Sequence, residues 1–106
     1  MNILFVCSRN QWRSPTAETI YKNHHGIFVK SAGTEPSARI KINSKLIEWA
    51  DIIFVMEKHH KQRISERFSD DTLSKRIIVL DIPDDYQYMD EELIDSIKRS
   101  IEPYLS

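Results

Sequence analysis

Residues 6–18, VCSRNQWRSPTAE, form the stretch that decides how this sequence folds. Before them, Ile3 to Val6 is a continuous apolar run, which is typical of a strand buried on both faces of a parallel sheet. After them, Pro15 suits the first turn of a helix. We therefore expect a tight strand-to-helix turn between Cys7 and Arg13.

The same alternation of apolar runs and helical patterns continues along the chain. Further strands are expected to begin at residues 27–29 and to span 52–56 and 77–80, and SAGTEP at 31–36 closes the first of them with turn residues. Helices are expected from Pro15 to near Gly26, at 44–50 with Asn43 or Ser44 as cap, at 57–68, and after Asp90 with an apolar face of Leu93, Ile94, Ile97 and Ile101. Residues 69–75 and 81–89 are expected to be loops, and 35–43 show no clear pattern. The prediction is a single α/β domain over residues 1–106, a four-stranded parallel sheet with helices on both faces.

Size and charge limit the classes of function. A chain of 106 residues fits one domain, and its net charge of −1 provides no overall attraction to nucleic acid or to a membrane. Cys7 is the single cysteine, so an internal disulfide is excluded and a reducing compartment is favoured. The N-terminal apolar run is too short for a signal peptide or a membrane span, so a cytoplasmic location is expected.

The turn after Cys7 has the residues needed to bind a phosphate above a thiolate. Helix N-termini and nearby cations favour the thiolate form of a cysteine, and backbone N–H groups of a curled loop bind anions. Arg13 can bind two phosphoryl oxygens through its planar guanidinium, and Ser14 can donate to the thiolate. Asn10 can tie the loop together through its side chain. The expected phosphate-binding residues are Ser8, Arg9, Asn10, Gln11, Trp12, Arg13 and Ser14.

A second loop, after the fourth expected strand, contains three aspartates. Asp81, Asp84 and Asp85 lie close enough in sequence to repel one another, which favours a proton on one of them. A protonated carboxyl could donate to a leaving group. Because the carboxyl ends of parallel strands meet at one edge of a sheet, this loop and the Cys7 turn are expected to share a site.

Four stretches together resemble the low-molecular-weight protein tyrosine phosphatases. The turn resembles that family's C-x5-R-S signature followed by P-x-A-E. The other three stretches are SAGT at 31–34, ADIIFVMEKHH at 50–60 and DIPDDY at 81–86. The resemblance implies a sheet in the order 2-1-3-4 and a cysteinyl-phosphate intermediate, formed without metal or cofactor. It implies hydrolysis of a phosphorylated protein or a small phosphomonoester.

The resemblance also implies roles for individual residues. Cys7 matches the nucleophile, Arg13 the phosphate ligand and Asp84 the general acid. Asn10, Ser14 and Ser31 match the residues of that family's hydrogen-bond network. Tyr86 matches the aromatic residue of the acid loop, so Tyr86 is expected to line the pocket together with Trp12.

Three departures from the family pattern bear on activity. Arg9 stands where a glycine is usual, so a positive φ there would strain the backbone. Asp85 replaces the proline that usually follows the acid. The segment 35–49 is short, which implies the loss of a substrate wall and of a buried histidine.

Alternatives remain open at this point. Arg9 and the short segment favour a phosphate-binding module with weak or no catalysis, whereas arsenate reduction would need an external thiol because Cys7 has no internal partner. Trp12 either lines a pocket or covers the core. His59 and His60 are expected on a solvated helix face without a metal, as part of the charged run Lys58, His59, His60, Lys61, Arg63 and Arg67.

Overall fold

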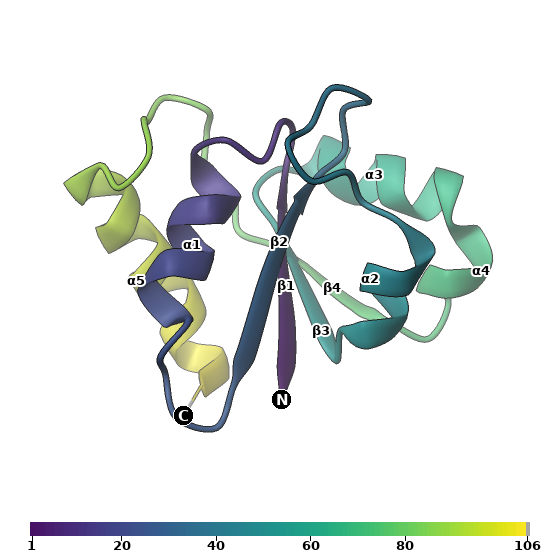
Figure 1. Ribbon diagram of the computed structural model, residues 1–106, viewed down its shortest axis with the longest axis horizontal. Coiled ribbons are helices and arrows are strands. Elements are labelled where there is room, and N and C mark those ends of the chain that lie inside the picture. Colours follow the sequence, from purple (N-terminus) through teal and green to yellow (C-terminus); the bar gives the residue numbers. More distant parts are fainter. Residues whose placement is uncertain (106) are drawn as a thin grey trace.

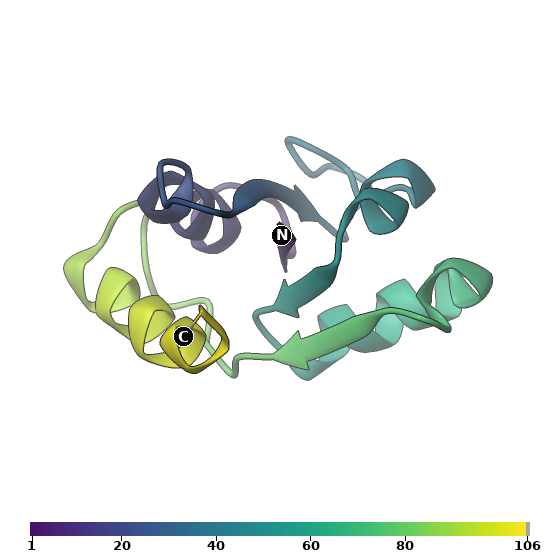
Figure 2. The same cartoon turned by 90° about the horizontal axis from the view of Figure 1, so that it is seen from below.

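A computed structural model describes residues 1–105 and has three layers. Four strands, β1 (Asn2–Cys7), β2 (Phe28–Gly33), β3 (Ile52–Val55) and β4 (Arg76–Val79), form one parallel sheet in the order β2-β1-β3-β4. Helices α1 (Arg13–Tyr21) and α5 (Glu91–Leu105) cover one face (Figures 1 and 2). Helices α2 (Ser44–Trp49), α3 (Lys58–Arg67) and α4 (Ser69–Thr72) cover the other. The predicted fold class and strand order are confirmed.

The central strand β1 explains why the sheet is buried on both sides. Ile3 and Phe5 belong to the core beneath α1 and α5, and Leu4 and Val6 belong to the core beneath α2 and α3. All four side chains are fully buried. Alternate residues of a strand point to opposite faces, so a continuous apolar run satisfies both cores at once.

Two boundaries differ from the prediction. Residues 69–72, expected to be loop, form the short helix α4. Helix α3 ends where Phe68 packs against the core. The chain then makes another helical turn, in which the Thr72 N–H donates to the Phe68 carbonyl. Helix α1 ends at Tyr21, and Gly26 lies further on in the connecting loop with a φ of 85°. The alternative caps of α2 are resolved in favour of Asn43, whose side chain accepts from the Leu46 N–H.

The carboxyl ends of the strands lie at the upper edge in Figure 1, where the loops after β1, β2 and β4 gather. The N-terminus and the C-terminal end of α5 lie at the opposite edge. Within residues 1–105, no helix combines the length and the apolar character required to cross a membrane.

Candidate active site

The loop after β1 is held from behind by the chain that follows β2. Backbone N–H groups of Thr34, Glu35 and Arg39 donate to the carbonyls of Cys7, Ser8 and Arg9 at 2.9 to 3.0 Å. In a trans peptide the carbonyl and the next N–H point in opposite directions, and no peptide bond within residues 1–105 is cis. The N–H groups that follow these carbonyls therefore turn away from residues 34–39, as an anion-binding loop requires.

The contact between the two loops explains why residue 33 is a glycine. It also gives a structural role to the segment 35–43, which had no clear pattern in the sequence. A Cβ on Gly33 would lie 2.6 Å from the Ser8 carbonyl oxygen and 2.9 Å from the Asn10 nitrogen. Gly33 also exchanges backbone hydrogen bonds with Ile40 and Ile42. The close approach of the two loops therefore depends on the missing side chain.

The positive φ of this loop is found at Asn10 and not at Arg9. Among residues 1–105, the non-glycine positions with positive φ are Asn10, Asp81 and Met89, so the condition under which Arg9 would be strained is not met. Asn10 has a φ of 56°, and asparagine tolerates this left-handed conformation better than most residues. Arg9 is free of the constraint and its side chain is exposed.

A buried hydrogen-bond network surrounds the cysteine sulfur. The Ser14 hydroxyl oxygen lies 3.0 Å from Cys7 Sγ, and Asn10 Nδ2 donates to Ser14 Oγ at 2.8 Å and to Ser31 Oγ at 2.9 Å. Ser31 in turn donates to a carboxylate oxygen of Glu18. Asn10 occupies an acceptor site on Ser14, so the single Ser14 hydrogen has two acceptors within reach: Cys7 Sγ at 3.0 Å and the Ala32 carbonyl oxygen at 3.3 Å. A negatively charged thiolate at Cys7 is the stronger acceptor of the two.

Arg13 is buried at the start of α1, and its guanidinium is fixed on one side. Nη1 donates to Glu57 Oε2 at 2.6 Å and to the Ile82 carbonyl at 2.9 Å. Nε lies 3.6 Å from Asp84 Oδ1, which is longer than a hydrogen bond. Nε and Nη2 therefore make no hydrogen bond within residues 1–105, and they form the pair suited to two oxygens of a phosphate.

The three aspartates after β4 lie in different places. Asp84 lines the same small pocket as Cys7 and Arg13, together with Ser8, Arg9, Gln11 and Trp12. Asp81 lines a neighbouring hollow with Pro83 and Glu57. Asp85 is exposed. The structure thus brings one carboxyl of the three to the cysteine loop.

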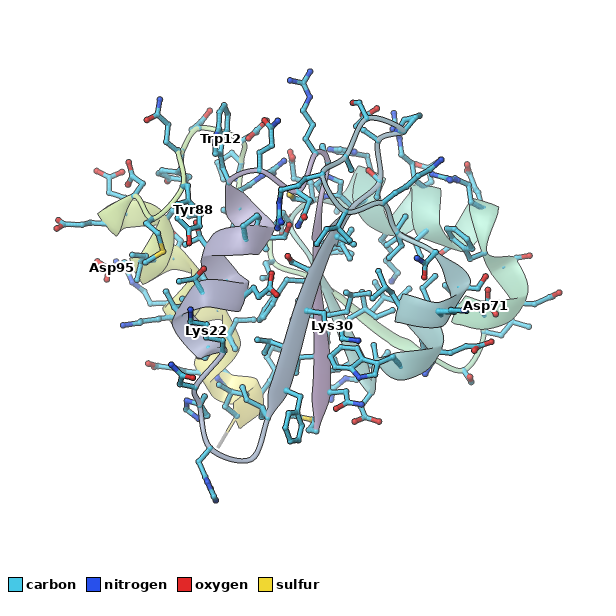
Figure 3. The ribbon with its side chains drawn as sticks, in the orientation of Figure 1. Trp12, Lys22, Lys30, Asp71, Tyr88 and Asp95 are labelled. Carbon is cyan, nitrogen blue, oxygen red and sulfur yellow. The ribbon has the colours of Figure 1, made fainter. Side chains whose placement is uncertain are left out.

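The aromatic residues separate into rim and core. Trp12 is 41% exposed and lines the small pocket beside Cys7. Tyr86, predicted to line it, packs against the core beneath α1 and α5, where its ring gains apolar burial. Trp12 and Tyr88 lie near one another at the α1 side of this edge (Figure 3). Tyr88 is hydrogen-bonded to Thr19 at 2.8 Å.

Two residues after β3, Glu57 and His60, contact the loop without having been predicted from the sequence. Glu57 caps α3 and binds Arg13. Burial alone would raise the pKa of Glu57, but the hydrogen bonds and charges of Arg13 and His59 together lower that pKa below its usual value. The position of Glu57, two residues after the end of a strand that borders β1, was the available signal.

His60 was predicted to lie on a solvated face, and this prediction was wrong. It is fully buried, because its ring completes the N-terminal turn of α3 by accepting from the Glu57 N–H and contacts Ser8 Oγ at 2.8 Å. A buried histidine therefore does contact the loop, from α3. The rest of the charged run is largely exposed, with Arg63 paired to Glu35 at 3.0 Å.

Glu57, His59 and His60 offer the one set of three potential metal ligands found within residues 1–105, with ligand atoms within 4.8 Å of one another. The groups are already engaged, however. Both ring nitrogens of His60 have hydrogen-bond partners, and Glu57 Oε2 binds Arg13. A metal ion would have to break these contacts, so the donor set does not fit a metal site.

Comparison with known proteins gives relatives of one kind. No family model matches the chain. Two proteins named protein-arginine-phosphatase are similar in sequence. The one from Geobacillus stearothermophilus is 36% identical over 90 residues, and the alignment covers 62% of this chain and 61% of the relative. The one from Bacillus subtilis is 30% identical over 95 residues, and the alignment covers 64% of this chain and 63% of the relative. The chain thus spans somewhat more than three fifths of these relatives.

Solved structures show the same fold over nearly the whole chain. The low-molecular-weight protein tyrosine phosphatase SP-PTP of Streptococcus pyogenes superposes with a TM-score of 0.79 at 18% identity, covering 98% of this chain and 90% of that one. The YwlE arginine phosphatase of Geobacillus stearothermophilus gives 0.74 at 24% identity, covering 98% and 92%. These likenesses in fold and in sequence confirm the resemblance of the chain to the low-molecular-weight protein tyrosine phosphatase family.

Proposed function

We propose that this protein is a metal-independent phosphatase that acts through a cysteinyl-phosphate intermediate. The observation that carries the proposal is the meeting of three groups in one pocket: Cys7, Arg13 and Asp84. They are a nucleophile, an anion ligand and a proton donor, which together are the groups that phosphate transfer to a thiol needs.

In the first step, the Cys7 thiolate attacks phosphorus while the bond from phosphorus to the leaving group breaks. The leaving atom takes a proton from Asp84, which becomes a carboxylate. Arg13 and the loop N–H groups hold the three phosphoryl oxygens, whose charge is spread in the transition state. The side of the Arg13 guanidinium that faces Asp84 makes no hydrogen bond within residues 1–105, which supports this role, because Glu57 and Ile82 hold the opposite side.

In the second step, water attacks phosphorus and the phosphorus–sulfur bond breaks, which releases inorganic phosphate. The Asp84 carboxylate accepts the proton from that water. The Ser14 hydroxyl, 3.0 Å from the sulfur, stabilises the departing thiolate. Asn10, through its bonds to Ser14 and Ser31, supports this orientation.

The substrate class proposed is a phosphorylated side chain of a protein or a small phosphate compound. The sequence relatives are protein-arginine-phosphatases and the structural neighbours include a tyrosine phosphatase, so phosphoarginine and phosphotyrosine are the two substrates to compare. The former has a nitrogen leaving group and the latter an oxygen. The same carboxyl at Asp84 can protonate either.

The test measures release of phosphate from p-nitrophenyl phosphate, a phosphotyrosine peptide and a phosphoarginine peptide, in the presence of a metal chelator. We expect turnover by the unmodified chain and its loss in Cys7→Ser. Activity that survives in Cys7→Ser would refute the cysteine mechanism. Binding of phosphate without turnover would instead identify a phosphate-binding module, and consumption of an external thiol that depends on arsenate would identify an arsenate reductase.

A further inference from the structure

The two ring nitrogens of His60 have different partners, and this fixes the position of the ring proton. Nδ1 accepts the backbone N–H of Glu57 at 3.0 Å. A nitrogen that accepts a hydrogen bond carries no proton, so the proton of the neutral ring is on Nε2.

The direction of the next hydrogen bond follows from this tautomer. Nε2 lies 2.8 Å from Ser8 Oγ, and therefore Nε2–H donates and the hydroxyl oxygen accepts. The Ser8 hydrogen cannot point back to His60. Within residues 1–105, Ser8 Oγ makes no other side-chain hydrogen bond, and Ser8 lines the pocket together with Cys7 and Arg13.

The surroundings of His60 keep the ring neutral. Burial is the main cause that lowers the pKa of His60 to about 3, and the charges of His59, Arg13 and Arg63 lower it further against the opposing effect of Glu57. Near neutral pH the ring therefore remains in the form that donates to Ser8.

We propose that the Ser8 hydroxyl donates a hydrogen bond to the bound phosphoryl group, and that His60 is the positioning residue that orients it. The inference rests on the proposed function, because it assumes that the pocket takes a phosphoryl group. It gives the first turn of α3 two contacts with the anion loop: Glu57 holds Arg13 at one end and His60 holds Ser8 at the other.

Four variants separate this role from a merely structural one. Ser8→Ala removes the hydroxyl. His60→Asn keeps an acceptor near the position of Nδ1 but loses the donor to Ser8, whereas His60→Gln keeps a donor near the position of Nε2. His25→Asn, in the exposed turn before β2, is the matched control.

The measurements are the Kd for inorganic phosphate by calorimetry, and KM and kcat for p-nitrophenyl phosphate. We expect Ser8→Ala and His60→Asn each to raise the phosphate Kd roughly tenfold, the loss of one hydrogen bond to a charged group. A double variant that combines Ser8→Ala with His60→Asn should bind phosphate no more weakly than Ser8→Ala alone, because both changes remove the same interaction. His60→Gln should recover binding to within about threefold, and His25→Asn should bind like the unmodified chain.

Nitrogen NMR of the His60 ring gives a readout that needs no turnover. We expect a protonated Nε2 and an unprotonated Nδ1 from about pH 5 to about pH 8. The proposal is overturned by the opposite tautomer, by unchanged phosphate binding in Ser8→Ala, or by effects of Ser8→Ala and His60→Asn that simply add. If His60→Asn does not fold, Ser8→Ala alone decides. A phosphate effect without any turnover would refute the proposed function and leave the Ser8 donor in place.

Discussion

At the scale of single residues, the main question is which of the three aspartates after β4 acts as the general acid. Asp84 lies 3.6 Å from Arg13 Nε and lines the pocket, whereas Asp81 faces a separate hollow and Asp85 is exposed. Replacing Asp84 by Asn should lower kcat by about 10²- to 10⁴-fold, the usual contribution of a general acid.

Asp81→Asn and Asp85→Asn are the matched controls, because each removes one carboxylate charge from the same loop. Asparagine also tolerates the φ of 56° found at Asp81. Steady-state kinetics with p-nitrophenyl phosphate should show changes of only about two- to threefold in these variants. A larger loss in either control than in Asp84→Asn would assign the acid elsewhere.

At the scale of elements, the joint between the anion loop and the chain after β2 depends on Gly33. Gly33→Ala would place a methyl group 2.6 Å from the Ser8 carbonyl oxygen, so one of the two backbones must move. We expect unfolding by denaturant to show a loss of about 1–3 kcal/mol. Phosphate binding should weaken as well, because the moved carbonyl belongs to the loop.

The other glycine of the chain provides the control. Gly26 has a φ of 85° and nothing lies within 4 Å of a Cβ built on it. Gly26→Ala therefore costs backbone strain of about 1–2 kcal/mol but leaves the anion loop alone. Equal phosphate affinity in Gly33→Ala and Gly26→Ala would contradict the proposed coupling between Gly33 and the loop.

At the scale of the whole molecule, His60 makes stability depend on pH. Its pKa is about 3 in the folded chain and 6.5 when unperturbed, so between these values the unfolded chain binds more protons. The contribution of His60 is complete above about pH 6.5 and is lost as the pH falls towards 3, by up to about 1.4 kcal/mol per pH unit.

Chemical denaturation at a series of pH values tests this dependence. Between about pH 6.5 and pH 5, before most carboxylates titrate, the free energy of unfolding of the unmodified chain should fall steadily. The curve for His60→Asn should be flatter over the same range. Parallel curves for the two proteins would show that His60 is not the group responsible.

The sequence pattern was sufficient to predict the parallel sheet and the residues of the loop after β1, whereas the order of the strands followed from the family resemblance. Apolar runs and turn residues are local signals, and the strand-to-helix turn at Cys7 can be found from them. The pairing of His60 with Ser8, 52 positions apart, has no such signal. His60 lies in a run of charged residues, and its burial is a product of tertiary packing at the start of α3.

The same limit applies to Arg9 and Gly33. A family pattern placed the special backbone position at residue 9, but in this chain Asn10 adopts the positive φ. The need for glycine at 33 arises from a second loop whose path the sequence pattern does not specify. Contacts between distant segments therefore account for most of what the sequence did not reveal.

Because residues 34–39 support the loop from behind, the residues that hold its shape differ from the residues at its surface. Backbone groups and buried side chains form its inner side, whereas Arg9, Gln11 and Trp12 are exposed at its rim. In the proposed phosphatase, changes at these three positions are therefore expected to alter which phosphorylated molecule is accepted while leaving Cys7, Arg13 and their buried partners in place. Substitutions at Arg9, Gln11 and Trp12 are therefore the changes by which substrate preference could be redesigned.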